Sequence, residues 1–346
     1  MTTEERKRLT ELIDVISPSM QEGIMTDLLA DKWIQLAPKG NIRKDAIGNL
    51  EFSVMKDASY PTLALVAHAD TICIQLTCSL GNGKFRFRSI GTSPHMLLGQ
   101  SLIILNEDNE EIEAVIGFDA TSQFGQPKGL VFEDLWVDIV DESKRQLVSI
   151  GDLAVLKPRH IIYNNDMISA TALDDRLGLF ITGEVLRKVM TEDIHINLIC
   201  VATAQEEVGL RGSVSFDFSH KPDAVIVLDV DYATDIPTPH EDQMGRLYLN
   251  NGAGIQRKAD NSPMLRKHIQ KVAKDNNLDY QVSLGRFVYG GTDSTSLQTT
   301  RNRTGYHIAN ISIPCRYMHS PIETASLKDV ETAIDIITSF AKNPMI

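Results

Sequence analysis

The sequence predicts an α/β protein, a mixed-sheet α/β/α sandwich with a small β-barrel domain inserted into it. Short apolar runs, typical of strands covered on both faces, alternate with helical patterns toward both ends of the chain. Between them, residues 71–161 hold several short β-rich runs and no convincing long amphipathic helix. The chain has 346 residues, of which 42% are hydrophobic, so two domains with a sizeable core are possible.

The N-terminal elements are predicted to be helices followed by a strand. Apolar residues repeat at helical spacing over residues 9–16 and again over 24–36. The run TLALVAHAD, over residues 62–70, is short, apolar and β-rich. It is typical of a strand buried on both faces, which would place it inside the sheet.

The middle of the chain is predicted to fold separately. KFRFRSI and EIEAVI alternate between polar and apolar residues with period two, while LGNGK and NEDNEE supply turns. We therefore expect an inserted all-β domain of residues 71–161. It would interrupt a discontinuous catalytic α/β domain of residues 1–70 and 162–346.

Alternation of helices and strands resumes near Asn164. INLICVAT, DAVIVLDV and ANISIP are the predicted strands, and DDRLGLFITGEVLRKVM is a predicted helix. Ser262 as N-cap and Pro263 at the first helical position start another helix. Ser326 and Asp329 have the spacing of a capping box at the start of the last helix.

Composition and charge limit the expected cellular location and the expected classes of binding partner. The formal net charge of −12 argues against nucleic acid or an anionic membrane as a partner. The N-terminus has no signal-peptide pattern, and no stretch is long and apolar enough to span a bilayer. None of the four cysteines forms a CxxC pair. We therefore expect reduced cysteines and a cytoplasmic protein.

Side chains that can bind metal ions follow four of the predicted strands. They are His68 and Asp70, Glu206 and Glu207, Asp229, and His319, and the turn TALDDR adds Asp174 and Asp175. Each is weak evidence alone, since a histidine after a strand usually sits in a loop and aspartates before a helix are usually caps. In open α/β sheets, however, sites form beyond the carboxyl ends of strands, so their convergence predicts a site there.

Counting ligands suggests how two zinc-like ions would share these residues, since each wants about four ligands. Asp174 would bridge the two ions. His68 and Asp229 would complete one ion, and Glu207 and His319 would complete the other. Each ion then has three protein ligands, and a shared water fills the fourth positions.

Two of the acidic residues left by this assignment have predicted roles of their own. Asp70 lies two residues from His68 on an extended segment and is predicted to orient the imidazole. Glu206, next to a predicted ligand, is predicted to be the general base beside the shared water. Of the two adjacent glutamates, Glu207 would bind metal and Glu206 would transfer protons.

The motifs HAD, ALDDR, QEEVGLRG, GGTDS and RYMHSPIE together resemble the dinuclear metallo-aminopeptidases called glutamyl, deblocking or tetrahedral (TET) aminopeptidases. The resemblance covers nearly the whole chain. It implies a cytoplasmic metallopeptidase, a hydrolase that releases N-terminal residues of peptide substrates with two divalent ions, Zn or Co, with Mn as a further option. It also implies the ligand set above, Glu206 as the base, and a cis peptide bond between Asp174 and Asp175.

The resemblance further implies a substrate pocket and an assembly. The loop of Gly290, Gly291, Thr292 and Asp293 would line the substrate side-chain pocket. The inserted domain would mediate subunit contacts, with dimers building a tetrahedral dodecamer.

The chain departs from the family pattern at three positions outside the predicted ligands. Met20 replaces the glycine of an N-terminal Ser-Gly-x-Glu pattern, and Thr71 and Cys73 replace Glu and Gly after Asp70. Two alternatives stay open: a related metal amidohydrolase or carboxypeptidase, and a metal-free binding subunit, against which the complete ligand set argues. Arg257 and Lys258 either favour acidic substrates or are simply exposed charges.

Overall fold

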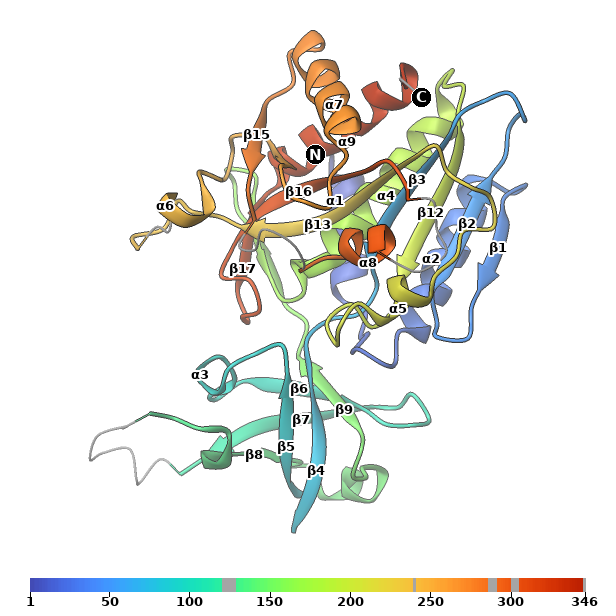
Figure 1. Ribbon diagram of the computed structural model, residues 1–346. Coiled ribbons are helices and arrows are strands. Elements are labelled where there is room, and N and C mark those ends of the chain that lie inside the picture. The colour runs from blue at the N-terminus through green and yellow to red at the C-terminus, as the bar shows by residue number, and fades with distance from the viewer. Residues whose placement is uncertain (120–128, 239–240, 286–290, 300–304, 345–346) are drawn as a thin grey trace.

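The computed structural model describes residues 1–119, 129–238, 241–285, 291–299 and 305–344. Within these residues the chain forms one large mixed sheet flanked by helices and a separate closed β-barrel (Figure 1). This confirms the predicted fold class, an α/β/α sandwich with an inserted barrel. No helix among the described residues combines the length and apolarity needed to cross a bilayer.

The large sheet places its parallel strands at the centre. Its main path runs β1 (Asn41–Lys44), β2 (Leu50–Val54), β12 (Asn197–Thr203), β3 (Thr62–His68), β13 (Ala224–Tyr232), β16 (Ile308–Arg316), β17 (Glu323–Ser326), β11 (Met167–Ala170) and β10 (His160–Ile162), with β14 (Ala253–Gln256) and β15 (Tyr280–Ser283) attached through β16. Strands β12, β3, β13 and β16 are mutually parallel, the outer pairs of the main path are antiparallel, and β14 pairs with β15 in parallel. The carboxyl ends of four strands therefore meet at one edge.

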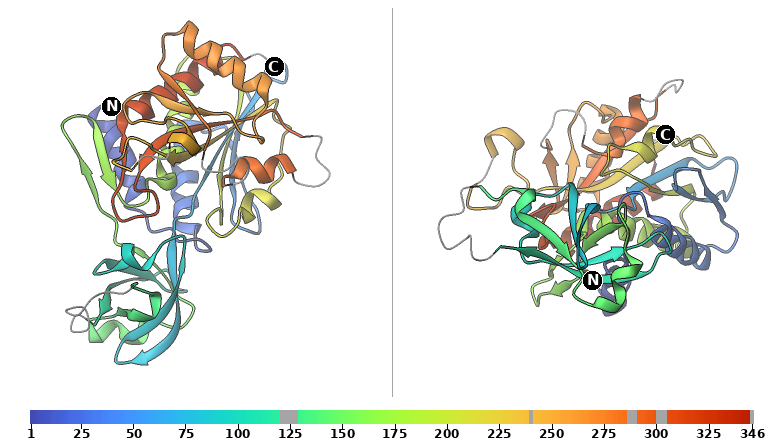
Figure 2. Two further views of the ribbon diagram at one scale, coloured as in Figure 1. Left: turned by 60° about the vertical axis from the view of Figure 1, so that its left-hand side comes forward. Right: turned by 90° about the horizontal axis from the view of Figure 1, so that it is seen from below.

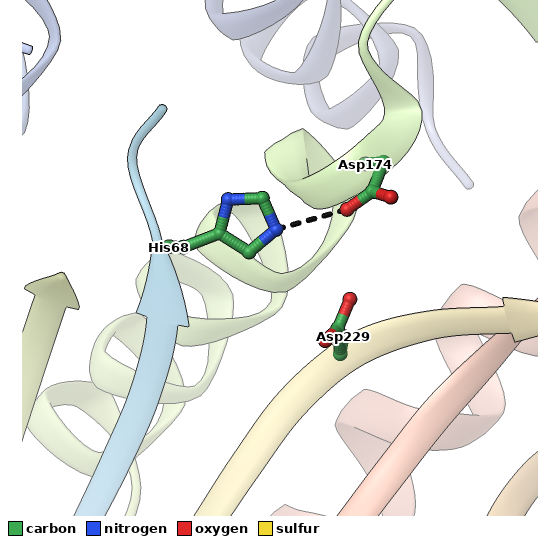
Figure 3. Close-up of side chains that lie close together, drawn as sticks. All are labelled: His68, Asp174 and Asp229. Atoms are coloured by element: carbon green, nitrogen blue, oxygen red, sulfur yellow. Dashed lines mark hydrogen bonds and ion pairs between the residues drawn. The ribbon is translucent and has the colours of Figure 1, made fainter. Parts of the chain in front are cut away.

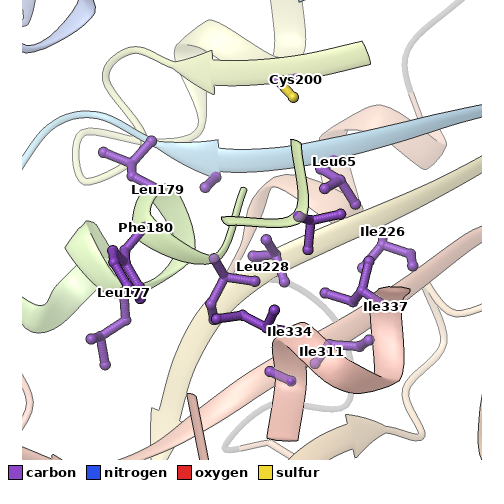
Figure 4. Packing of buried hydrophobic residues seen from close by; sticks show 14 of the residues in the cluster. Leu65, Leu177, Leu179, Phe180, Cys200, Ile226, Leu228, Ile311, Ile334 and Ile337 are labelled. Carbon is purple, nitrogen blue, oxygen red and sulfur yellow. The ribbon is translucent and has the colours of Figure 1, made fainter. Parts of the chain in front are cut away.

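Helices cover both faces of this sheet (Figures 1 and 2). One face carries α1 (Thr3–Ile13), α2 (Gly23–Leu36), α4 (Leu173–Thr191), α7 (Pro263–Asp275) and α9 (Leu327–Lys342), and the other carries α5 (Arg211–Ser215) and α8 (Asp293–Thr299). Leu63 and Leu65 of β3 belong to the larger core, whereas Ala64 and Val66 belong to the smaller core on the opposite face. Figure 4 shows the larger core, where Leu65 and Ile226 pack near Ile337 of α9. Strands buried on both faces explain the continuous apolar runs.

The barrel lies to one side of the sandwich and has its own core. Its strands are β4 (Cys73–Gly81), β5 (Lys84–Ile90), β6 (Ser101–Leu105), β7 (Glu111–Phe118), β8 (Leu135–Asp138) and β9 (Leu153–Leu156), with the short helix α3 (Pro94–Leu97) and two 3₁₀ turns (Phe132–Asp134, Glu142–Leu147). The alternation in KFRFRSI points Phe85 and Phe87 into the barrel core. The barrel strands lie between Cys73 and Leu156, whereas β10 pairs with β11 in the large sheet.

The predicted caps are partly correct. The Ser262 side chain accepts a hydrogen bond from Leu265 N at the start of α7. Ser326 caps α9 through Lys328 N, but Asp329 does not complete a capping box. Its carboxylate instead accepts hydrogen bonds from the backbone N–H groups of Asn250 and Gly252, both at 2.8 Å. The Asp329 side chain thus makes a tertiary contact, whereas its spacing from Ser326 predicted a contact within the helix.

Met20 occupies a backbone conformation that suits glycine, with φ of +82°. Its side chain is 41% exposed and contributes little packing. We expect Met20→Gly to raise the free energy of unfolding by about 0.5–1 kcal/mol, because relief of the left-handed strain exceeds the added entropy of the unfolded chain. Urea denaturation measures this change.

The matched control for this substitution is Met55, which is 42% exposed and is not among the described residues with positive φ. Met55→Gly should lower the free energy of unfolding by about 0.5–1 kcal/mol. Destabilisation by Met20→Gly of the same size would show that side-chain contacts, rather than backbone strain, dominate at residue 20.

Candidate metal centre

The predicted ligands gather at the carboxyl edge of the parallel strands. His68 ends β3, Asp229 lies within β13, Glu207 follows β12, and His319 follows β16. Asp174 lies at the start of α4, where its backbone is not helical and the peptide bond to Asp175 is cis. Figure 3 shows the side chains of His68 and Asp174 pointing toward each other, with Asp229 beside them.

These five side chains form two groups that share one member. Ligand atoms of His68, Asp174 and Asp229 all lie within 4.8 Å of one another, and so do those of Asp174, Glu207 and His319. Asp174 Oδ1 is 2.9 Å from His68 Nε2, and Asp174 Oδ2 is 3.4 Å from His319 Nε2. The two oxygens of one carboxylate therefore face different histidines, as a bridging ligand requires.

Burial and charge in this cluster fit divalent cations. Burial, together with the nearby charge of Asp174, raises the pKa of Glu207 to about 8 and that of Asp229 to about 7. Although burial opposes it, hydrogen bonds from His319 and His68 keep the pKa of Asp174 below its usual value. Glu207 Oε1 is buried and has no hydrogen-bond partner among the described residues. Imidazole nitrogens with carboxylate oxygens are a donor set for Zn, Co or Mn.

Asp70 lies beside His68, as the sequence predicts, and it also makes contacts that the sequence does not predict. His68 Nδ1 lies 3.1 Å from the main-chain oxygen of Asp70 and 3.5 Å from its carboxylate. The carboxylate oxygens also accept the N–H groups of Glu206 at 2.9 Å and Glu207 at 3.1 Å. Ser19 Oγ donates a third hydrogen bond at 2.7 Å. The Asp70 side chain therefore holds the two glutamates in place, and its backbone contacts the histidine.

Glu206 belongs to neither group of candidate ligands. Its side chain lines the cavity that the cluster opens into. Burial, and then the charges of Asp229, Glu207 and Asp293, raise the pKa of Glu206 well above its usual value, against the opposing effect of His68. It is thus a carboxyl group next to the ligands that is placed to accept or donate a proton.

Two further contacts to the cluster were not predicted. The carboxylate of Glu323, 2% exposed, accepts the N–H of His319 at 2.8 Å and that of Asp174 at 3.1 Å. His319 Nδ1 lies 2.7 Å from the carbonyl oxygen of Gly91, a residue of the barrel segment. Glu323 stands in the RYMHSPIE motif, but a search for metal donors alone does not reveal its role. No local pattern connects Gly91 with His319.

The cluster opens into a cavity of about 360 Å³. Of the predicted substrate-binding residues, Gly291 and Thr292 line it, and Gly290 lies outside the described residues. The Thr292 side chain also hydrogen-bonds Asp229. Asp293 is 2% exposed and is not among the lining residues, since Thr203 Oγ1 donates to its carboxylate at 2.5 Å. Asp231, Gln256 and Lys258 also line the cavity.

Known aminopeptidases are similar to this protein over almost the whole chain. Residues 48–336 match the family model described as M42 glutamyl aminopeptidase. The chain is 31% identical over 304 residues to a putative aminopeptidase of Acetivibrio thermocellus, covering 86% of each protein. It is 27% identical over 324 residues to the lysyl aminopeptidase of Pyrococcus furiosus, covering 90% of this chain and 88% of that protein.

Solved structures show the same similarity. A TET aminopeptidase from a marine sediment archaeon of the Thaumarchaeota superposes with a TM-score of 0.88 at 25% identity, covering 99% of this chain and 98% of that chain. The TET1 peptidase of Pyrococcus horikoshii superposes with a TM-score of 0.81 at 25% identity, covering 98% and 99%. That peptidase is described as assembling into a tetrahedron or a large octahedral shell.

Proposed function

The chain belongs to the M42 glutamyl aminopeptidase family and is an aminopeptidase, a hydrolase of peptide bonds. We propose that it hydrolyses these bonds with a two-metal centre and a glutamate as general base. The observation that carries the proposal is the position of Asp174, which is the shared member of two groups of candidate ligands. In the proposal, Asp174 would contribute to both metal sites. His68 and Asp229 would complete one site, and Glu207 and His319 would complete the other. Bound there, Zn²⁺, Co²⁺ or Mn²⁺ would polarise the scissile carbonyl and stabilise negative charge on its oxygen.

Glu206 is the proposed general base. Its carboxylate takes a proton from the attacking water as the new C–O bond forms, and passes that proton to the leaving amine as the C–N bond breaks. Asp70 supports this role because its carboxylate fixes the backbone N–H groups of Glu206 and Glu207. Glu323 supports the other side by holding the backbones of Asp174 and His319. Glu206 thus transfers the proton, and Asp70 and Glu323 fix the backbone of the residues around it.

A substrate panel combined with metal analysis tests this function. We expect the purified enzyme to cleave aminoacyl p-nitroanilides with a free α-amine and to leave N-acetylated and C-terminal chromogenic substrates intact. Removal of metal by a chelator should abolish activity, and Zn²⁺, Co²⁺ or Mn²⁺ should restore it. Cleavage of N-acetylated substrates at comparable rates would favour an amidohydrolase instead. A protein that takes up no metal and cleaves nothing would be a binding subunit.

The wall of the cavity indicates which N-terminal residue is preferred. Lys258 lines the cavity, whereas Arg257 is exposed and is not among the lining residues. The nearby Asp231 is 5% exposed, and its carboxylate accepts hydrogen bonds from Ser283 and Gln256. Lys258 is therefore a positive charge in the lining of the cavity that a substrate would enter.

We expect Lys258→Glu to reduce the preference for glutamyl over lysyl substrates by about tenfold or more in kcat/KM, which corresponds to about 1.4 kcal/mol of differential binding. The expectation follows because the substitution puts a carboxylate where a substrate carboxylate would approach. Arg257→Glu changes the net charge equally and should leave the ratio of the two kcat/KM values unaltered. If both variants, or neither, change that ratio, selectivity does not come from Lys258.

We also propose that the protein is a homo-oligomer, in which dimers build a dodecamer and the barrel domain makes subunit contacts. The barrel segment exposes several large apolar side chains, including Leu80, Val131, Val140 and Ile150. Exposed apolar surface of this kind favours protein contacts. Light scattering coupled to size exclusion chromatography measures the number of chains in the assembly. The cytoplasmic location stays a prediction.

A further inference from the structure

A short N-terminal segment packs against the backbone of the proposed catalytic centre. We call Ser17 to Glu22 the N-terminal brace. Ser17 Oγ donates to the carbonyl oxygen of Ala69 at 2.7 Å, and Thr71 N donates to the carbonyl oxygen of Ser17 at 3.0 Å. With the Ser19 hydrogen bond to Asp70, the brace fixes the segment that follows His68.

Glu22 extends the brace to the turn that carries Glu206. Its side chain stands at the start of α2 but makes no capping hydrogen bond to that helix. It is 4% exposed, and its Oε1 accepts the N–H groups of Met20 at 2.8 Å and Gln205 at 3.0 Å. A buried carboxylate with this many backbone donors is fixed in orientation.

Together, Glu22 and Asp70 bind three successive N–H groups. Gln205 N donates to Glu22, and the next two N–H groups donate to Asp70. Gln205 has φ of +57°, a left-handed conformation that directs the chain sharply away from the end of β12. The contact from Glu22 holds the residue whose backbone conformation sets the direction of Glu206.

We propose that Glu22 is a positioning residue for the reaction: its carboxylate fixes the backbone of Gln205 and thereby aims the side chain of Glu206 into the cavity. The inference rests on the proposed role of Glu206 as the base. Glu22 is a member of neither group of candidate ligands found among the described residues, so its effect should fall on the chemical step and not on metal content. A displacement of about 1 Å in a catalytic group can cost about a hundredfold in rate.

The test compares Glu22→Ala with Glu22→Gln. We expect the alanine variant to lose about tenfold to a hundredfold in kcat, with KM within about twofold of wild type and unchanged metal content. Glutamine keeps an oxygen acceptor for both N–H groups and should restore most of kcat. Burial, followed by the charge of Asp70, raises the pKa of Glu22 to about 7, so a neutral amide is a mild change at this position.

Asp329 provides the matched control. It is 1% exposed and, like Glu22, accepts two backbone N–H groups and does not line the catalytic cavity, but its donors are Asn250 and Gly252 instead of the segment that carries Glu206. Asp329→Ala should lower thermal stability while keeping kcat. An equal loss of kcat in both alanine variants would mean that Glu22 matters only for folding, and the inference would be wrong.

A double variant separates this inference from the proposed function. If Glu22 acts through Glu206, adding Glu22→Ala to Glu206→Gln should lower kcat by less than twofold further. An inactive Glu206→Gln with a fully active Glu22→Ala would overturn only the role of Glu22, whereas an active Glu206→Gln would overturn the proposed base. Should the alanine variant not fold, Glu22→Asp keeps the charge but shortens the reach to Gln205. It should then show the loss of kcat, and wild-type kcat in it would overturn the inference.

Discussion

Glu206→Gln is expected to lower kcat by about two to four orders of magnitude while both metal ions stay bound. The amide cannot take a proton from water, yet it has nearly the shape of the carboxyl group and keeps the backbone contact with Asp70. Because Glu206 belongs to neither group of candidate ligands, metal content should not change. Steady-state kinetics on a free-amine substrate and metal analysis of the same sample measure the two quantities.

The neighbouring residue is the control for this prediction. Glu207→Gln makes the same chemical change one position further along, but Glu207 lies with Asp174 and His319. It should therefore lose metal as well as activity, and excess metal should restore part of the activity. If Glu206→Gln retains near-full peptidase activity with both ions bound, another group carries the proton.

Asp174→Ala is expected to abolish binding of both ions and to reduce activity below detection. Asp174 is the member common to both groups of candidate ligands, so its loss leaves each with two protein ligands. His68→Ala and His319→Ala each remove a ligand from one group, and each should retain about one ion per chain. Metal analysis after dialysis distinguishes two, one and zero ions.

Thermal unfolding gives an independent readout for Asp174. Ions that bind only the folded state raise its stability by mass action, so added Zn²⁺ should raise the Tm of metal-free wild type. The Tm of Asp174→Ala should not respond to Zn²⁺, whereas that of Asp329→Ala, which also removes a buried carboxylate, should respond as wild type does. Retention of two ions in Asp174→Ala would exclude it as the bridge.

Much of the fold and of the site was predictable because it leaves local signals. Buried parallel strands give continuous apolar runs and the barrel gives period-two alternation. His68 ends β3, His319 follows β16, and Asp229 lies in the carboxyl-terminal half of β13. A sheet of parallel strands brings residues near the carboxyl ends of its strands to one edge. The histidine and carboxylate side chains at these positions therefore indicated a cation site.

Other predictions from local spacing were wrong or incomplete. Asp329 has the spacing of a capping-box residue but bonds a distant turn. The Asp70 carboxylate lies beside His68 as expected, but it also accepts the N–H groups of the two glutamates, which the spacing did not indicate. In both cases several partners were possible for one carboxylate, and only the folded chain decided between them.

The sequence by itself determined the alternation of helices and strands, the inserted barrel and the candidate donor side chains, because periodicity and residue chemistry are local properties. Only the tertiary structure decided how these donors are held. Glu323 bonds Asp174 across 149 residues, Glu22 bonds Gln205 across 183, and Gly91 bonds His319 across 228. Hydrogen bonds over such separations obey no sequence period, since they depend on which turns the packed sheet brings within about 3 Å.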